Sequence, residues 1–443
     1  MKSVQNDMTV GSPMKMILSF TFPIFLGNVF QQFYNMADAV IVGKFVGTKA
    51  LAAVGSTGTI MFLIYGFVVG MTAGFTVLTA QKFGAGDMQG MRRTVAGAGI
   101  LSLLIGLFLT VTFMLFMKPL LHLMHTPSDI FADAYKYIMI VSGGILAQML
   151  YNLLSSILRA LGNSKIPLYF LIISAILNIF GDLFFVIVLK AGSNGCAIST
   201  VLSEALCCLF CIIYIQKKVP ILRLGKKWLV FDSRLLKKTI AYGWASAMQQ
   251  ATVQMGKIAI QALVNTMGVS VAAAFAVVNR IDDFAITPEQ NIAHAMTALM
   301  AQNKGAGKND RMREGFRCGM ILEIVYGAAV MVICQVFAGE LMALFVKDEE
   351  VIGHGVIYLH LIAVMYILPA VTNAIQGFFR GIGDLKVTLM SSFTNMAVRV
   401  IAAAPMILLW NFGIEALPYS YLAGWVAMLL VETPLMIRIY RKK

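Results

Sequence analysis

The chain has 443 residues, of which 59% are hydrophobic and only 13% charged, and its mean hydropathy is +0.80. Soluble domains carry about a quarter of charged residues. This composition therefore excludes a soluble enzyme, a disordered protein and a disulfide scaffold. It predicts an all-α membrane protein that crosses the bilayer many times.

Twelve apolar segments are long enough to span a bilayer, because one span needs about 20 apolar residues. In chain order they are 16–42, 51–79, 94–117, 137–158, 166–189, 196–216, 240–265, 269–300, 315–338, 356–379, 387–410 and 419–437. An even number of transmembrane helices puts both termini on the same side of the membrane. The polar N-terminal segment has no signal-peptide pattern, so we expect the first span to be retained.

The basic residues are unevenly distributed between the two sides. Of 35 Lys and Arg, 26 lie on the side of the termini, six on the other side and three inside spans. The positive-inside rule then predicts cytoplasmic termini. Basic loops beside anionic lipid headgroups also account for the net charge of +14 without a nucleic-acid partner.

The two halves of the sequence repeat at a shift of 221 residues. The motif at 80–86 matches 301–307, and the loop 159–165 matches 380–386. Asn152 matches Asn373. Corresponding loops lie on the same side of the membrane, so the halves are predicted to be parallel repeats.

We therefore expect two six-helix lobes, at 1–216 and 240–443, joined by a basic cytoplasmic linker at 217–239. Paired lobes of this kind are typical of transporters that work by alternating access. A duplicated helical bundle with another role is the alternative.

Polar residues in the first lobe suggest a cation site. Asp38, Asp182 and Thr200 lie on three spans at a similar predicted depth in the outer leaflet. Asn178 precedes Asp182 by one turn, and Tyr34 precedes Asp38 by one turn, so each pair shares a helix face. Carboxylate, amide and hydroxyl oxygens suit either H⁺ or Na⁺. The alternative is that the two aspartates cap backbone groups or pair with a buried cation.

Two further residues of this lobe have open interpretations. Glu204, one turn beyond Thr200, either joins the polar network or is a packed, neutral carboxyl. Pro23 bends the first span. That bend is either a static kink or a lever that responds to cation binding at Asp38.

The second lobe carries a different set of ionisable residues: Lys257, Asp282, Asp283, Glu289 and Arg399. One interpretation pairs Lys257 or Arg399 with Asp282 or Glu289, which would fix the lobe. The other is a second proton or substrate site. Gly66, Gly70 and Gly74 share a helix face in the first lobe and are assigned to helix packing.

Motifs for nucleotide hydrolysis, zinc proteolysis and serine hydrolysis are missing from the sequence. We therefore expect no enzyme activity and no cofactor. Na⁺ at Asp38, Asn178, Asp182 and Thr200 is the only metal site that the pattern suggests.

Several of these features together resemble the multidrug and toxic compound extrusion (MATE) family, in its DinF-like prokaryotic branch. They are Pro23, Asp38 within 36–43, the repeated motif at 81–86 and 302–307, and the loop that begins Arg159-Ala160-Leu161-Gly162. The resemblance implies a cation site at Asp38, Asn178, Asp182 and Thr200, with Tyr34 nearby. It also implies export of organic cations driven by H⁺ or Na⁺ across a bacterial or archaeal cytoplasmic membrane.

The resemblance has one departure. Another branch of the family uses a Glu on the seventh span and an Asp on the tenth, where this chain has glutamines and Lys257 on the seventh and Asn373 on the tenth. This weakens the case for a second-lobe cation site of that type.

The sequence therefore predicts a monomeric multidrug efflux antiporter whose partners are small organic substrates and membrane lipids. Pro23, Tyr34, Asn152 and Glu204 are its candidate substrate-facing or supporting residues. The alternative is a flippase of lipid-linked precursors, for which Lys257 and Arg399 would supply positive charge. A membrane-embedded enzyme or receptor would need a catalytic set that the sequence does not offer.

Overall fold

The computed structural model describes residues 6–223, 225 and 232–441, and these form helices and no strand. They divide into two compact units. The first unit comprises Met1–Asp7 and Phe22–Ala247, and the second comprises Met8–Thr21 and Met248–Lys443. Residues 224 and 226–231 of the predicted linker lie outside the described residues.

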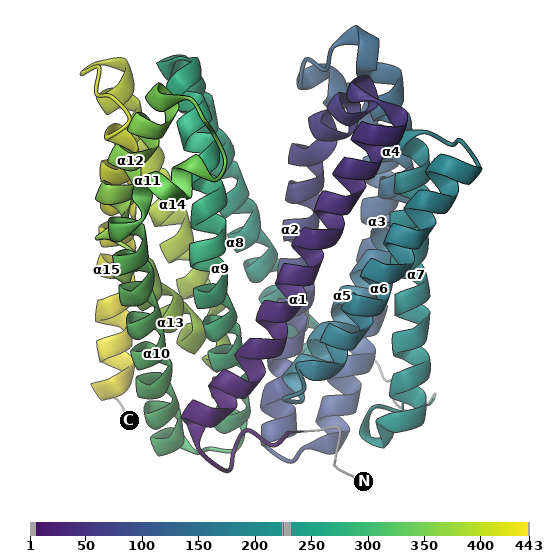
Figure 1. Cartoon of the computed structure of the whole chain (residues 1–443). Coiled ribbons are helices and arrows are strands. Elements are labelled where there is room, and N and C mark those ends of the chain that lie inside the picture. Colours follow the sequence, from purple (N-terminus) through teal and green to yellow (C-terminus); the bar gives the residue numbers. More distant parts are fainter. Residues whose placement is uncertain (1–5, 224, 226–231, 442–443) are drawn as a thin grey trace. The chain divides into compact units, whose positions relative to one another are not determined.

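The first half of the chain contains six long or bent helical segments (Figure 1). Its elements are α1 (Pro13–Ile41), η1 (Val42–Val46), α2 (Thr48–Gly84), α3 (Met88–Leu123), α4 (Ser128–Gly143), α5 (Ile145–Ala160), α6 (Lys165–Leu183), η2 (Phe184–Val188), α7 (Ser193–Lys218) and η3 (Pro220–Leu222). The short elements η1 and η2 are π-helical turns that continue α1 and α6.

The second half repeats this order. Its elements are α8 (Ser233–Val264), η5 (Asn265–Met267), α9 (Val269–Gly305), α10 (Asn309–Val336), α11 (Ala338–Ala343), α12 (Glu349–Ala363), α13 (Ile367–Ile382), α14 (Leu385–Leu408) and α15 (Ala416–Arg441). Both ends of α9 lie 221 residues after those of α2, the shift found in the sequence. The predicted all-α repeat is thus present helix by helix.

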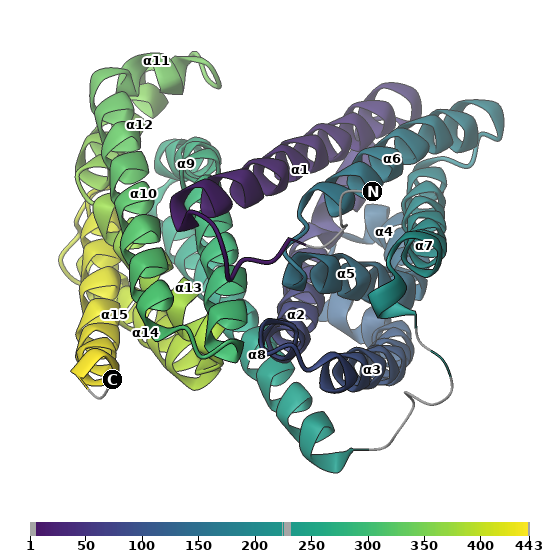
Figure 2. The same ribbon diagram turned by 90° about the horizontal axis from the view of Figure 1, so that it is seen from below.

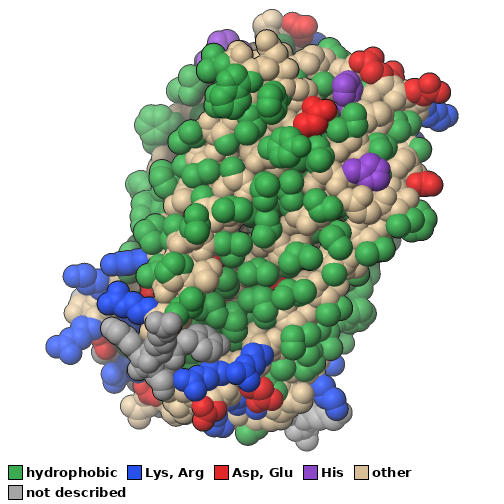
Figure 3. Space-filling model, turned by 90° about the vertical axis from the view of Figure 1, so that its left-hand side faces the viewer, with side chains coloured by type: hydrophobic (Ala, Val, Ile, Leu, Met, Phe, Trp, Pro, Cys, Tyr) green, Lys and Arg blue, Asp and Glu red, His purple; other side chains and the backbone are tan. Residues whose placement is uncertain are grey.

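Eight of the described helices are long and apolar enough to cross a bilayer, and two bent pairs add two more spans. The remaining two predicted spans correspond to α8 and α9, of 32 and 37 residues. Both contain charged residues within the predicted span, Lys257 in α8 and Arg280, Asp282, Asp283 and Glu289 in α9. On the face shown in Figure 3, hydrophobic side chains cover the middle, and most of the visible Lys and Arg gather at one end.

The spans predicted as continuous at 137–158 and 356–379 are broken in the structure. The first consists of α4 and α5, bent by 45°, and the second of α12 and α13, bent by 52°. Gly144 forms the first break, where a Cβ atom would lie 2.6 Å from Val201 of α7. Pro369 in the first turn of α13 has no N–H to donate, which suits the start of a new helix.

The first half of α8 packs on the first unit. A Cβ atom on Gly74 of α2 would overlap the carbonyl of Tyr242, and one on Gly243 would overlap the ring of Phe75. The indole of Trp244 also meets the ring of Phe67 edge-on, with centroids 6.0 Å apart. These contacts explain why the boundary between the compact units lies within α8, after Ala247.

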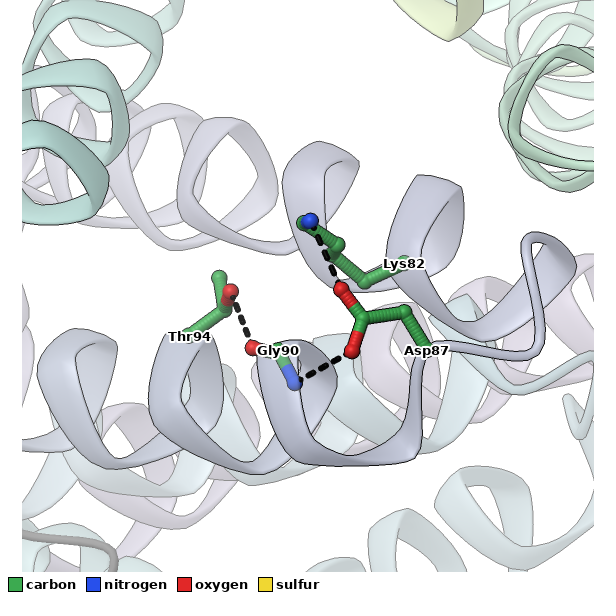
Figure 4. Close-up of polar contacts among 4 residues, drawn as sticks. All are labelled: Lys82, Asp87, Gly90 and Thr94. Atoms are coloured by element: carbon green, nitrogen blue, oxygen red, sulfur yellow. Dashed lines mark hydrogen bonds and ion pairs between the residues drawn. The ribbon is translucent and has the colours of Figure 1, made fainter.

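The turn between α2 and α3 is held by Asp87 (Figure 4). Its carboxylate accepts a hydrogen bond from the N–H of Gly90 at 2.7 Å and pairs with Lys82 at 2.8 Å. The hydrogen bond from Lys82 and that from Gly90 lower the pKa of Asp87. Asp87 is thus the N-cap of α3.

Replacing the capping carboxylate should lower stability. We expect Asp87→Ala to reduce the free energy of unfolding by about 1 kcal/mol, because the cap is lost while a partly exposed ion pair adds little. Since the folded pKa is lowered, this contribution is present above the ordinary pKa of Asp and disappears as the pH falls through the folded value. Thermal unfolding of purified protein at several pH values measures it.

Asp310→Ala is the matched control. This fully exposed carboxylate lies in the first turn of α10 and pairs with Arg313 at 3.8 Å without capping the helix. Equal losses of stability from both variants would contradict the capping role of Asp87.

Candidate functional site

Two carboxylates face each other inside the first unit. Asp38 lies near the end of α1 and Asp182 near the end of α6, and each helix then continues into a π turn. The π turns η1 and η2 pack together through an apolar cluster that includes Val42, Val186 and Cys196. The side chains of Asp38 and Asp182 are close enough for their charges to interact.

Neither carboxylate is satisfied by its neighbours. Asp182 is fully buried, and Ser199 and Cys196 approach it without reaching hydrogen-bond geometry. Both Asp182 oxygens and Oδ1 of Asp38 are buried without a hydrogen-bond partner. Among the described residues, no basic side chain forms a salt bridge with either aspartate. Buried carboxylates of this kind are expensive unless a proton or a cation joins them.

An amide and a hydroxyl lie beside the two carboxylates. Nδ2 of Asn178 donates to Oγ1 of Thr200 at 3.2 Å, and the Oγ of Ser199 donates to the carbonyl of Asn178 at 2.7 Å. Oδ1 of Asn178 is buried and has no partner. A Cβ atom on Gly181 would overlap the Oγ of Ser199, so this glycine allows α6 and α7 to approach closely. The structure thus brings Asp38, Asn178, Asp182 and Thr200 together.

Several further polar residues lie near these four side chains. Tyr34 lies close enough to both Asp38 and Glu204 to interact with their charges. Glu204 accepts a hydrogen bond from Nε2 of Gln148 at 3.4 Å, and Asn152 donates to the carbonyl of Gln148 at 2.9 Å.

Sequence analysis missed Gln148 and two tyrosines of this group, Tyr65 and Tyr137. Gln148 is 6% exposed although it lies in an apolar span, and its Oε1 atom is buried without a hydrogen-bond partner. A polar residue in the middle of an apolar span could have identified Gln148 as a candidate from the sequence.

Pro23 lies inside α1, as predicted. The division of the chain into units also falls here, between Thr21 and Phe22. The proline removes one backbone hydrogen bond at this position. The helix that carries Asp38 therefore lacks one backbone hydrogen bond close to the boundary between the units.

The pairing that sequence analysis considered for the second unit is not found. Lys257 pairs with Asp283, with 3.6 Å between Nζ and Oδ1, and both side chains are at least half exposed. Asp282 instead accepts a hydrogen bond from the hydroxyl of Tyr366. The guanidinium of Arg399 stacks on the ring of Tyr421, 3.6 Å from its centroid. Tyr366 is thus the partner of Asp282 in place of a basic residue, and Tyr421 is the partner of Arg399 in place of a carboxylate.

Three glutamates of the second unit are fully buried. Glu289 accepts a hydrogen bond from Nδ2 of Asn373 at 3.4 Å. Glu432 accepts one from Ser391 at 2.6 Å. Glu323 is fully buried, and both of its oxygens lack a hydrogen-bond partner. Sequence analysis overlooked Glu323 and Glu432, although each is a charged residue within a predicted span.

The copy of the repeated motif at 302–307 has a structural role in the second unit. Oε1 of Gln302 accepts a hydrogen bond from the N–H of Met8 at 2.9 Å, and Nδ2 of Asn303 donates to the Met8 carbonyl at 3.1 Å. Lys308 donates to the carbonyl of Thr9 at 2.8 Å. The motif that revealed the repeat therefore fixes the segment that precedes α1.

A repeated bundle of membrane-spanning helices with unsatisfied polar groups inside it defines a multi-pass membrane transporter. The MatE family model matches residues 23–184 and 245–405, one segment in each half. The chain belongs to this family of transporters, which are not enzymes.

Relatives of known sequence and structure agree with this assignment. The chain is 31% identical over 396 residues to the probable multidrug resistance protein YpnP of Bacillus subtilis, covering 88% of each chain. It is 28% identical over 436 residues to the probable multidrug resistance protein YoeA of the same organism, covering 96% of this chain and 93% of YoeA. A MATE transporter crystallised with MaD3S has the same fold, with a TM-score of 0.91, 22% identity and coverage of 100% and 99%.

The close approach of α6 and α7 can be tested with a single methyl group. We expect Gly181→Ala to reduce substrate transport at least about tenfold, because the added Cβ pushes Ser199 away and separates Asn178 from Thr200. Transport in proteoliposomes measures this effect.

Gly55→Ala is the control, since nothing lies within 4 Å of the Cβ position there. Adding Ser199→Ala to Gly181→Ala should restore part of the activity. Unchanged transport by Gly181→Ala would contradict the proposed packing requirement.

Proposed function

We propose that this transporter is a multidrug efflux antiporter that exports amphipathic, often cationic, compounds in exchange for H⁺ or Na⁺. The observation that carries the proposal is the pair of neighbouring carboxylates, fully buried Asp182 and partly buried Asp38, with no basic partner among the described residues. The names of the Bacillus relatives support multidrug compounds as the substrate class. We further propose a monomer in a bacterial or archaeal cytoplasmic membrane, with both termini in the cytoplasm.

The chemistry of the pair supports coupling to a small cation. Two like charges side by side in a medium of low dielectric repel each other strongly. One H⁺ on a carboxyl, or one Na⁺ between oxygens of Asp38, Asn178, Asp182 and Thr200, removes that repulsion. The site should therefore bind the incoming cation tightly in the state open to the outside and release it in the state open to the cytoplasm.

Exchange requires that cation and substrate favour different states of the transporter. A ligand shifts a conformational equilibrium only by its difference in affinity for the two states, and about 5.5 kcal/mol moves a ratio from 1:99 to 99:1. Pro23 lies between Asp38 and the unit boundary in α1. We propose that neutralising the pair changes the bend of α1 at Pro23 and so disfavours bound drug.

The two aspartates provide the direct test. We expect Asp38→Asn and Asp182→Asn each to abolish dye export, because an amide cannot take up H⁺ and carries no charge for Na⁺. Proteoliposomes with a dye inside, given a pH gradient or a Na⁺ gradient separately, measure export and identify the ion. Asp133→Asn, an exposed aspartate of the same unit, is the control. Full export by both variants would refute the site.

The second unit offers a separate comparison. Because the proposal puts coupling in the first unit, Glu289→Gln should retain ion-driven dye export within about threefold, its hydrogen bond with Asn373 being preserved by an amide. Loss of export with Glu289→Gln at normal expression would instead support a second ion site there.

The flippase alternative is distinguished by substrate. It predicts movement of a lipid-linked pyrophosphate across the same vesicles. Lys257 pairs with Asp283, and Arg399 is buried against the ring of Tyr421, so these cations support a flippase less than the unpartnered carboxylates support cation exchange. This arrangement favours the antiporter.

A further inference from the structure

The first unit has a cavity that the proposed transport cycle does not use. It lies between α3 and the beginning of α8 and has a volume of about 560 Å³. Both helices belong to the first unit at these positions, and their ribbons are labelled in Figure 2. At Gly97 the helices are close, since a Cβ atom there would lie 3.1 Å from Leu236 of α8.

The wall of the cavity is apolar. Ile100 and Leu104 of α3 and Ile240 of α8 line it, and they are 43%, 58% and 43% exposed. All three lie on segments that we predict to be in the membrane. Side chains of this type at the surface of a span contact lipid acyl chains.

Two basic residues also line the cavity. They are Arg93 of α3 and Lys237 of α8, and Nε of Arg93 is buried without a hydrogen-bond partner. The one acidic residue of the lining, Asp232, accepts hydrogen bonds at 3.1 Å from the N–H groups of Arg234 and Leu235. Asp232 thus caps α8, while the guanidinium of Arg93 keeps a donor available.

This combination matches one kind of ligand. An anionic phospholipid has a phosphate that accepts hydrogen bonds and acyl chains that need an apolar wall. Basic pockets between helices on the cytoplasmic side of a membrane protein are suited to such headgroups. A free phosphate would leave the apolar wall unused, and a zwitterionic lipid would bring no net charge to Arg93 and Lys237.

We propose that the cavity between α3 and α8 binds one anionic phospholipid of the cytoplasmic leaflet. Its phosphate contacts Arg93 and Lys237, and an acyl chain lies along Ile100, Leu104 and Ile240. By contacting both helices, the lipid stabilises the packing of the beginning of α8 against α3. This inference is independent of the proposed coupling ion, since it concerns neither Asp38 nor Asp182.

Lipid-dependent stability tests the proposal. Full-length protein, stripped of lipid in detergent, is titrated with phosphatidylglycerol or with phosphatidylcholine of the same acyl chains, and its unfolding temperature is recorded. We expect a saturable rise with phosphatidylglycerol that phosphatidylcholine does not reproduce. Arg93→Gln with Lys237→Gln should weaken the apparent affinity about tenfold or more, at roughly 1 kcal/mol for each basic residue.

Two further variants make the result specific. Lys217→Gln with Lys218→Gln removes the same charge from exposed residues at the end of α7, outside the cavity, and should keep the phosphatidylglycerol effect. If the double variant at Arg93 and Lys237 does not fold, Lys237→Glu replaces it, because Lys237 is exposed.

Three outcomes would overturn the proposal. One is an equal effect of both lipids. Another is an equal loss in the Lys217 and Lys218 control, which would mean general attraction to the basic surface. The third is full stabilisation by inorganic phosphate, which would mean an anion site without a lipid.

Discussion

Electrostatic repulsion between two carboxylates is the interaction on which this account depends. Asp38 and Asp182 lie on different helices, Asp182 is fully buried and Asp38 partly buried, and neither has a basic partner among the described residues. Such an arrangement is costly for a protein that only needs to be stable. It is useful to one that must bind and release a small cation. The π turns η1 and η2 pack together and so hold the ends of α1 and α6, with their carboxylates, in this unfavourable proximity.

Two helices pass from one unit to the other, and each carries a distinctive feature. The division falls beside Pro23 in α1, which also carries Asp38. In α8 it falls after Ala247, while the beginning of that helix borders the cavity assigned to lipid. In the proposed scheme, cation binding at Asp38 and lipid binding beside α8 would each act on a helix that is shared by the units. A transporter that alternates between states needs such helices to change conformation without breaking.

Much of the fold could be predicted because hydropathy and repetition are properties of the sequence itself. The shift of 221 residues predicted the correspondence of α2 with α9, and the structure confirms it. The bends at Gly144 and before Pro369 were missed, because an apolar run gives no sign of a change in helix direction. The nearness of Asp38, Asn178, Asp182 and Thr200 was expected from depth and helix face. Their role in coupling stays a prediction.

Other features could not be predicted, because they depend on which helices pack together. Arg399 stacks on Tyr421, and Asp282 binds Tyr366, so aromatic partners replace the expected ion pairs. Such partners are far apart in sequence and leave no spacing to recognise. Glu323 and Glu432 could have been recognised from the sequence, because each is a charged residue within an apolar span.

Running the exchange in reverse tests cation coupling at Asp38 and Asp182, because coupling between two ligands is reciprocal. Vesicles containing the purified protein are given a dye gradient and no ion gradient, and internal pH and Na⁺ are followed with indicators. The account predicts that dye leaving the vesicles drives H⁺ or Na⁺ inward in the natural protein and that Asp182→Asn moves no ion. Inward ion movement of normal size with Asp182→Asn would contradict it.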